Sequence, residues 1–173
     1  MVKIKSFDAI LHAIFKEQNI APSKAALSDE LLRIYKSVGE VEISGSYRFL
    51  SYKNAEEMNR ILHEDFEELE TKFWPFAETG TGDTWFLNLE CTNSKSGVFF
   101  YDHDLEEYSR ENMLDMEIGL KQWFQLADLT KQVYEKNEHL ELDFSLKSEV
   151  KEIFIKQMEK INLGLSKIYP YKI

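Results

Sequence analysis

The chain has 173 residues, 43% of them apolar and 13% aromatic, and its formal net charge is −10. This length and composition fit one domain with a substantial core. No run of about 18 apolar residues occurs, and no basic segment precedes an apolar one, so the sequence predicts a cytoplasmic protein with neither a membrane span nor a signal peptide. The single cysteine, Cys91, excludes an internal disulfide framework and a thiolate metal site.

The negative charge is concentrated in the middle third of the chain. Residues 56–117 contain 17 acidic and 4 basic residues, a net charge of −13, whereas residues 1–55 carry +2 and residues 118–173 carry +1. Binding to nucleic acid rests mainly on Lys and Arg that neutralise phosphates, so this distribution disfavours a nucleic acid partner. A field of this sign concentrates cationic partners and repels polyanions.

Two amphipathic helices are predicted near the N-terminus. The first spans about residues 6–17, with Ser6 as its N-cap and apolar residues at helical spacing behind it. The second begins after Ser28, a favourable N-cap, and carries Asp29 and Glu30 in its first turn, where the helix dipole favours acids. Gly39 is its expected stop. Alternating apolar residues then predict two short strands around a turn, at 41–43 and 47–50.

The strongest helical pattern comes next. Asn54 and Glu57 have the spacing of a capping box, and an apolar stripe continues at helical spacing from Met58 to Phe73. Pro75 is expected to end the helix, because the residue before a proline is pushed out of the α region. The opposite face carries acids and is interpreted as a solvated helix face: Glu56, Glu64, Glu67, Glu68 and Glu70.

The densest combination of turn and strand signals lies between residues 73 and 104. Gly80, Gly82 and Asp83 predict a tight turn into an aromatic strand at 84–89, and a second aromatic strand follows at 98–101. Strands joined in this way form an antiparallel pair, with one face free for helices to cover. Residues 102–115 are polar and acidic. Helical periodicity resumes near Glu117, and a last amphipathic helix is predicted from about Ser148 to residue 168.

Residues suited to catalysis are sparse. The four histidines are scattered and never occur in HExxH spacing: His12, His63, His103 and His139. Gly80 and Gly82 lack the lysine and following helix of a phosphate-binding loop, so turn geometry explains them better. The segment Asp102-His103-Asp104 could bind a divalent ion with Asp83 from the neighbouring turn, but these ligands fall short of the six to eight oxygens that calcium takes. We therefore expect no metal site, no cofactor and no enzymatic activity.

The order of these features resembles the SUKH superfamily over about residues 25–130. The features that carry the resemblance are a capped helix, a short strand pair, a helix leading into Trp74-Pro75-Phe76, the Gly82-Asp83 turn, two aromatic strands ending at Tyr101-Asp102, and a helix with Trp123-Phe124. That superfamily includes a fungal cell-wall synthesis regulator and many bacterial immunity proteins. The resemblance implies an α+β fold, with a central antiparallel β-sheet flanked by helices, in a single domain of residues 1–173 with an extra C-terminal helix.

The resemblance and the charge together give the leading hypothesis: a monomeric immunity protein, or antitoxin, that binds and blocks a cognate polymorphic toxin with a basic cleft, such as a nuclease. The acids expected to contact this protein partner gather at adjacent strand ends: Asp83, Asp102, Asp104, Glu106 and Glu107. One alternative is a regulatory scaffold of the cell-wall-regulator type, which recruits partners without blocking an active site. Another is a metal-dependent enzyme built on Asp102, His103 and Asp104.

Overall fold

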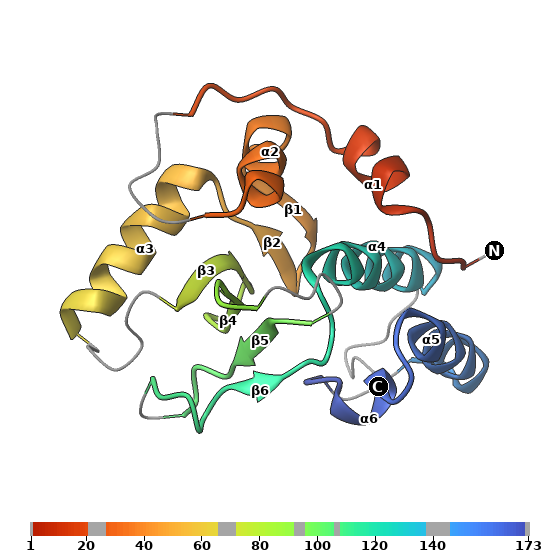
Figure 1. The fold of residues 1–173 in the computed structure, drawn as a ribbon. Coiled ribbons are helices and arrows are strands. Elements are labelled where there is room, and N and C mark those ends of the chain that lie inside the picture. The colour runs from red at the N-terminus through yellow and green to blue at the C-terminus, as the bar shows by residue number, and fades with distance from the viewer. Residues whose placement is uncertain are drawn as a thin grey trace.

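The computed structural model describes residues 2–20, 27–65, 72–91, 96–105, 108–137 and 146–171, and these residues form an α+β fold. Six strands make one antiparallel sheet in the order β1-β2-β3-β4-β5-β6 (Figure 1), which is the order of the chain: β1 (Val41–Ser44), β2 (Tyr47–Phe49), β3 (Phe73–Glu78), β4 (Thr84–Asn88), β5 (Val98–Tyr101) and β6 (Leu114–Asp115). The helices are α1 (Phe7–Ala13), α2 (Asp29–Ser37), α3 (Tyr52–Asp65), α4 (Leu120–Lys136), α5 (Ser148–Ile161) and α6 (Leu165–Ile168).

Local capping sets the start of the first three helices. Ser6 accepts a hydrogen bond from the amide of Ala9, and Ser28 accepts one from the amide of Leu31, so both predicted N-caps are confirmed. The predicted capping role of Asn54 is wrong. α3 begins at Tyr52, and the hydroxyl of Ser51 accepts the amide hydrogen of Asn54 at 3.2 Å, because serine one turn earlier satisfies the same free donors.

The predicted continuation of the third helix to Phe73 is also wrong. The described part of α3 ends at Asp65, and Phe73 is the first residue of β3. Pro75 lies inside that strand, opposite Phe86, where the register shifts between Pro75 and Ala77. A bulge tolerates a residue without an amide hydrogen, which explains a proline in a central strand. The expected helical acids Glu67, Glu68 and Glu70 lie outside the described residues.

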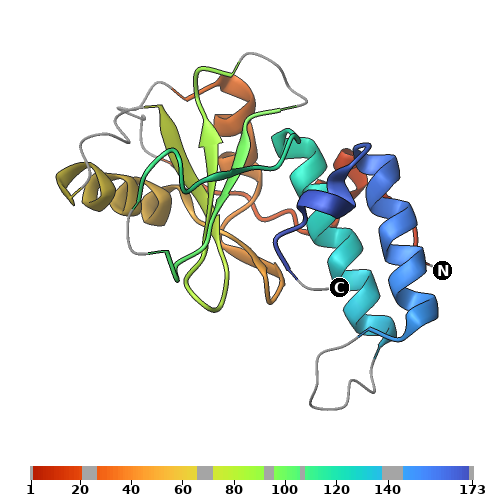
Figure 2. The same ribbon diagram turned by 90° about the horizontal axis from the view of Figure 1, so that it is seen from below.

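The hairpin of β4 and β5 is buried on both faces rather than one. Trp85 and Phe100 belong to a large cluster shared with α2, α4 and α5, whereas Phe86 and Phe99 belong to a smaller cluster shared with Leu62 of α3. Figure 2 shows α3 on the side of the sheet opposite α4 and α5. Side chains alternate between the faces of a strand, so a continuous aromatic run fits a strand covered on both sides.

The sheet ends in a strand that the sequence did not predict. β6 has two residues, pairs with β5 through Phe99 with Asp115 and Phe100 with Leu114, and forms an edge of the sheet (Figure 1). The predicted last helix is confirmed from Ser148 and is followed by the separate short helix α6. Among the described residues, no helix combines the length and the apolar character needed to cross a bilayer.

Candidate functional site

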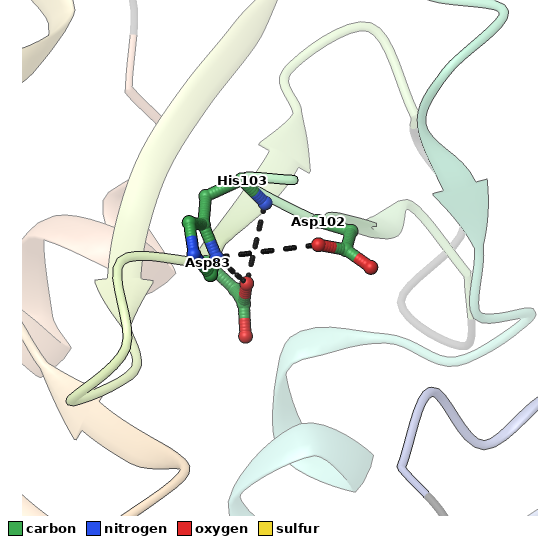
Figure 3. A group of neighbouring side chains, drawn as sticks. All are labelled: Asp83, Asp102 and His103. Atoms are coloured by element: carbon green, nitrogen blue, oxygen red, sulfur yellow. Dashed lines mark hydrogen bonds and ion pairs between the residues drawn. The ribbon is translucent and has the colours of Figure 1, made fainter. Parts of the chain in front are cut away.

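The pairing of β4 with β5 brings two acidic segments together. Thr84 lies opposite Tyr101, so Asp83, just before β4, stands beside Asp102 and His103, just after β5. Figure 3 shows the three side chains converging at this end of the hairpin. One ligand-type atom from each lies within 4.8 Å of the others. The expectation that Asp83 approaches the 102–104 segment is confirmed.

Asp83 is the buried centre of this group. Its side chain is 9% exposed, and both carboxylate oxygens accept hydrogen bonds. The hydroxyls of Thr79 and Thr81 lie 3.2 and 3.1 Å from Oδ2, and the backbone amide of His103 donates to Oδ1 at 3.2 Å. The turn itself is closed by bonds between Thr79 and Asp83, and Gly82 adopts a φ of +106°, which favours glycine. Asp83 therefore joins the β3–β4 turn to the chain after β5.

The imidazole of His103 completes the group. Its Nδ1 lies 2.6 Å from Oδ1 of Asp83, while its Nε2 lies 3.4 Å from Oδ1 of Asp104. The hydrogen bond to Asp83 raises the pKa of His103, and the charges of Asp104, Asp83 and Asp102 add to this effect, while desolvation opposes it. For Asp83, burial acts to raise the pKa, but the hydrogen bonds from His103, Thr81 and Thr79 prevail and leave that pKa below its ordinary value.

The acids predicted to contact a partner differ in accessibility. The side chains of Asp102 and Asp104 are 53% and 84% exposed, so both are available at the surface. Asp83 is covered, and its oxygens are occupied by internal hydrogen bonds, so an incoming side chain reaches its neighbours first. Glu106 and Glu107 lie outside the described residues. Their place in the site stays a prediction.

Exposed acids continue along the sheet margin beyond this group. We use the name acidic edge for the exposed acids that follow β5 and lie before, in or after β6: Asp102, Asp104, Glu111, Asp115 and Glu117. Within the described part of the chain, none of these five has a Lys or Arg within 4.0 Å. The described basic side chain in this segment, Arg110, stacks 4.4 Å from the ring centre of Phe99. Among the described residues, the acidic edge therefore has no cationic partner apart from His103, which lies 4.0 Å from Asp102 and 3.4 Å from Asp104.

Acids near α3 and β2 are arranged differently. Arg60 bridges Glu57 and Glu64 along one helical face, at 2.7 and 2.5 Å. Arg48 on β2 pairs with Glu40 and, at 3.0 Å, with Glu78. Each arginine thus pairs with two carboxylates. Glu57, Glu64 and Glu78 belong to the acidic middle third of the chain, and Glu40 precedes it.

Sequence reasoning missed several members of the site. The alternation Thr79, Thr81, Asp83 was a usable signal, because hydroxyls two and four residues before a turn aspartate can reach its carboxylate. Glu111, Asp115 and Glu117 gave no such signal, since their shared margin depends on the unpredicted strand β6. The sequence indicates His103 as a metal ligand candidate, whereas the structure places it as the partner of Asp83.

Asp83, Asp102 and His103 are the described residues that could hold a metal ion. Their three ligand atoms are fewer than calcium requires. The two oxygens of Asp83 and the Nδ1 of His103 already satisfy one another or the threonine hydroxyls. The geometry thus accounts for the cluster as a hydrogen-bonded group, and the metal-dependent enzyme stays an untested alternative.

A groove of about 500 Å³ lies elsewhere, between α3 and the sheet, and Asp83, Asp102 and Asp104 do not line it. Its lining residues are Leu50, Asn54, Glu57, Met58, Ile61, Leu62, Glu78 and Tyr108. Both of its acids belong to the arginine-paired set. The groove and the acidic edge are therefore separate features.

Comparisons of the chain with models of protein families, with curated proteins and with solved structures gave no match.

Proposed function

We propose that this protein is a binding protein of the immunity type, which neutralises a toxin by docking the acidic edge onto a basic surface. The observation that carries the proposal is the contrast in pairing. In the described residues the five acids of the edge have no Lys or Arg within ion-pair distance, and only Asp102 and Asp104 approach a histidine, His103. The acids around Arg48 and Arg60 are each paired with an arginine. Unneutralised surface charge of one sign steers an oppositely charged partner and fixes its orientation.

The resemblance to the SUKH superfamily supports the same proposal. The antiparallel sheet flanked by helices agrees with the architecture that the resemblance implies, and its immunity members act by binding rather than catalysis. In this proposal the partner is a toxin domain whose cleft binds a polyanion, such as a nuclease. The protein covers that cleft with carboxylates in place of phosphates.

The test is growth of a bacterial host that expresses the toxin domain encoded beside this gene. Co-expression of the wild-type chain is expected to restore growth. A variant with all five edge acids converted to amides is expected to lose this protection: Asp102→Asn, Asp104→Asn, Glu111→Gln, Asp115→Asn and Glu117→Gln. The amides keep the oxygens that accept the backbone hydrogens of Asp104 and Glu117, so the local turns persist.

A matched control removes the same charge elsewhere. Five exposed acids outside the edge are converted to amides: Asp8, Glu17, Glu42, Glu149 and Glu152. The control variant is expected to protect as well as the wild type. Equal loss in both variants would show that net charge matters and the edge does not. Absence of a toxin gene beside this one would favour the regulatory scaffold, whose partner is also recruited by charge.

A further inference from the structure

Residues 102–105 carry two of the five edge acids. This segment is hydrogen-bonded to a residue far away in the sequence, Asp83. Within this segment the bonds are local: the amide of Asp104 donates to Oδ1 of Asp102 at 2.9 Å, and the amide of Leu105 donates to the carbonyl of Asp102 at 3.1 Å. The hydroxyl of Tyr101, at the end of β5, donates to the carbonyl of Leu105. In the described part of the chain, the hydrogen bonds from this segment to an element beyond β5 end on Asp83, 20 residues away. Asp83 thus anchors the segment to the β3–β4 turn.

The anchor is rigid on both sides. Asp83 receives the hydroxyls of Thr79 and Thr81 on one oxygen and two groups of His103 on the other. Gly82 lies under the imidazole, because a Cβ built there would meet Cγ of His103 at 3.6 Å. The ring therefore packs on the turn, while the side chains of its neighbours Asp102 and Asp104 are 53% and 84% exposed.

We propose that Asp83 and His103 form a clasp, which holds residues 102–105 against the β3–β4 turn and presents the carboxylates of Asp102 and Asp104 to a cationic side chain of the partner. This inference rests on the proposed function for the identity of the partner, but the clasp itself is a property of the isolated chain. Asp83 and His103 are positioning residues, and Asp102 and Asp104 are the contact residues.

The charges around the clasp favour this division of roles. Asp83 faces His103 from the β3–β4 turn, while Asp102 and Asp104 face it from its own segment. A protonated His103 pairs most closely with Asp83, at 2.6 Å, and lies farther from Asp104 and Asp102, at 3.4 and 4.0 Å. The two outer carboxylates are 53% and 84% exposed and stay accessible to a partner. Preorganised side chains bind more tightly because less conformational freedom is lost on association.

The probe for the experiment is a hexalysine peptide, whose affinity is measured by isotope-edited NMR titration at low salt. His103→Ala is expected to weaken binding about threefold to tenfold, the cost of ordering one or two side chains that the clasp now holds. Asp83→Ala is expected to weaken it to a similar degree. In the double variant the losses are expected not to add, because both changes break the same contact.

The effect of His103→Ala on hexalysine affinity distinguishes the clasp from an explanation by charge alone. Removal of a cationic group from an acidic surface strengthens hexalysine binding if charge alone decides, whereas the clasp predicts weaker binding. His103→Gln is the conservative control: its amide can donate to Asp83, so it is expected to retain most of the affinity. Additive losses, or tighter binding by His103→Ala, would overturn the proposal.

Amide hydrogen exchange gives a second readout without any ligand. In both alanine variants the amides of Asp104 and Leu105 are expected to exchange about tenfold faster or more through local opening, an acceleration larger than that of the amides in β4 and β5, which follow the stability of the whole fold. Unchanged exchange would contradict the clasp. The two proposals fail separately: growth protection that survives loss of the edge acids overturns the immunity function, and unchanged exchange overturns the clasp alone.

Discussion

Two acidic regions of this molecule differ in whether their carboxylates are paired with arginine. Along α3 and β2, Arg60 and Arg48 each bridge two carboxylates, and the acids there contribute to local structure. Along the acidic edge, carboxylates are exposed without such partners in the described residues. The count of charges in a stretch of sequence treats these regions alike. Their difference identifies which acids are available to a partner.

The largest effect on stability is expected at the point where the edge is anchored. Asp83→Ala removes a buried carboxylate that accepts hydrogen bonds from Thr79, Thr81 and His103, and those donors lose their partner. We expect a loss of about 1.5–3 kcal/mol in the free energy of unfolding, measured by urea denaturation. Asp83→Asn keeps the shape and an accepting oxygen, so its loss is expected to be smaller. Equal stability of wild type and alanine variant would contradict the account.

A smaller loss in the free energy of unfolding is expected when Arg48, which pairs with two carboxylates, is replaced. Arg48→Ala leaves Glu40 and Glu78 without their shared cation, but these side chains are partly exposed and water screens them. The expected loss is about 1 kcal/mol in urea denaturation. Arg48→Lys should recover only part of it, since an ammonium does not span two carboxylates as a guanidinium does. A full recovery by lysine would show that the fork geometry is unimportant.

The sequence predicts the two regions unequally, for physical reasons. The pairing of Glu57, Arg60 and Glu64 follows from helical spacing of three and four residues, and the caps at Ser6 and Ser28 are equally local. The pairing of Arg48 with Glu78 depends on which strands become neighbours. Local rules therefore account for the starts of α1 and α2 and for one face of α3.

The candidate site shows the same limit. The approach of Asp83 to Asp102 was predictable, because a hairpin places the residues flanking its strands side by side. The burial of Asp83 was not, since it depends on the threonine hydroxyls and on the imidazole packing over Gly82. The sequence does not predict β6, because two exposed residues carry no periodic signal. The acids of the acidic edge that lie near β6 are therefore not predicted either.

The pH dependence of stability distinguishes the clasp from the arginine pairs. The pKa of Asp83 is lowered by folding, so its contribution is present above its unfolded pKa and is lost as pH falls through the folded pKa. The pKa of His103 is raised, so its contribution is present below its unfolded pKa, about 6.5, and is lost as pH rises through the folded pKa.

The clasp is therefore expected to stabilise most between the two unfolded pKa values, about 3.9 for Asp83 and about 6.5 for His103, and to lose its contribution as pH passes either folded pKa outside that window. The measurement is the difference in unfolding free energy between wild type and Asp83→Asn across pH. That difference should decline at both ends of the window. His103→Gln should remove the decline on the alkaline side, and a difference that is flat from acid to alkaline pH would rule out a coupled pair.

The smallest effect on stability is expected for Arg60→Ala, because the arginine and both of its acids are exposed. The thermal midpoint should stay nearly unchanged. The variant instead frees Glu57 and Glu64 and turns a paired helix face into an unpaired one. We expect this face to gain affinity for hexalysine in NMR titration, while Arg33→Ala, which touches neither acid, serves as the control. No gain would mean that pairing does not control access to the acids.

The most direct test maps hexalysine binding on the wild-type protein by amide chemical shifts. The account predicts that shifts concentrate at Asp102–Leu105 and around Asp115 and saturate together, with smaller changes along Glu57–Glu64. The affinity should fall steeply as salt rises, as expected for exposed charges. Equal or larger shifts along α3 would contradict the claim that unpaired acids at the sheet edge form the binding surface.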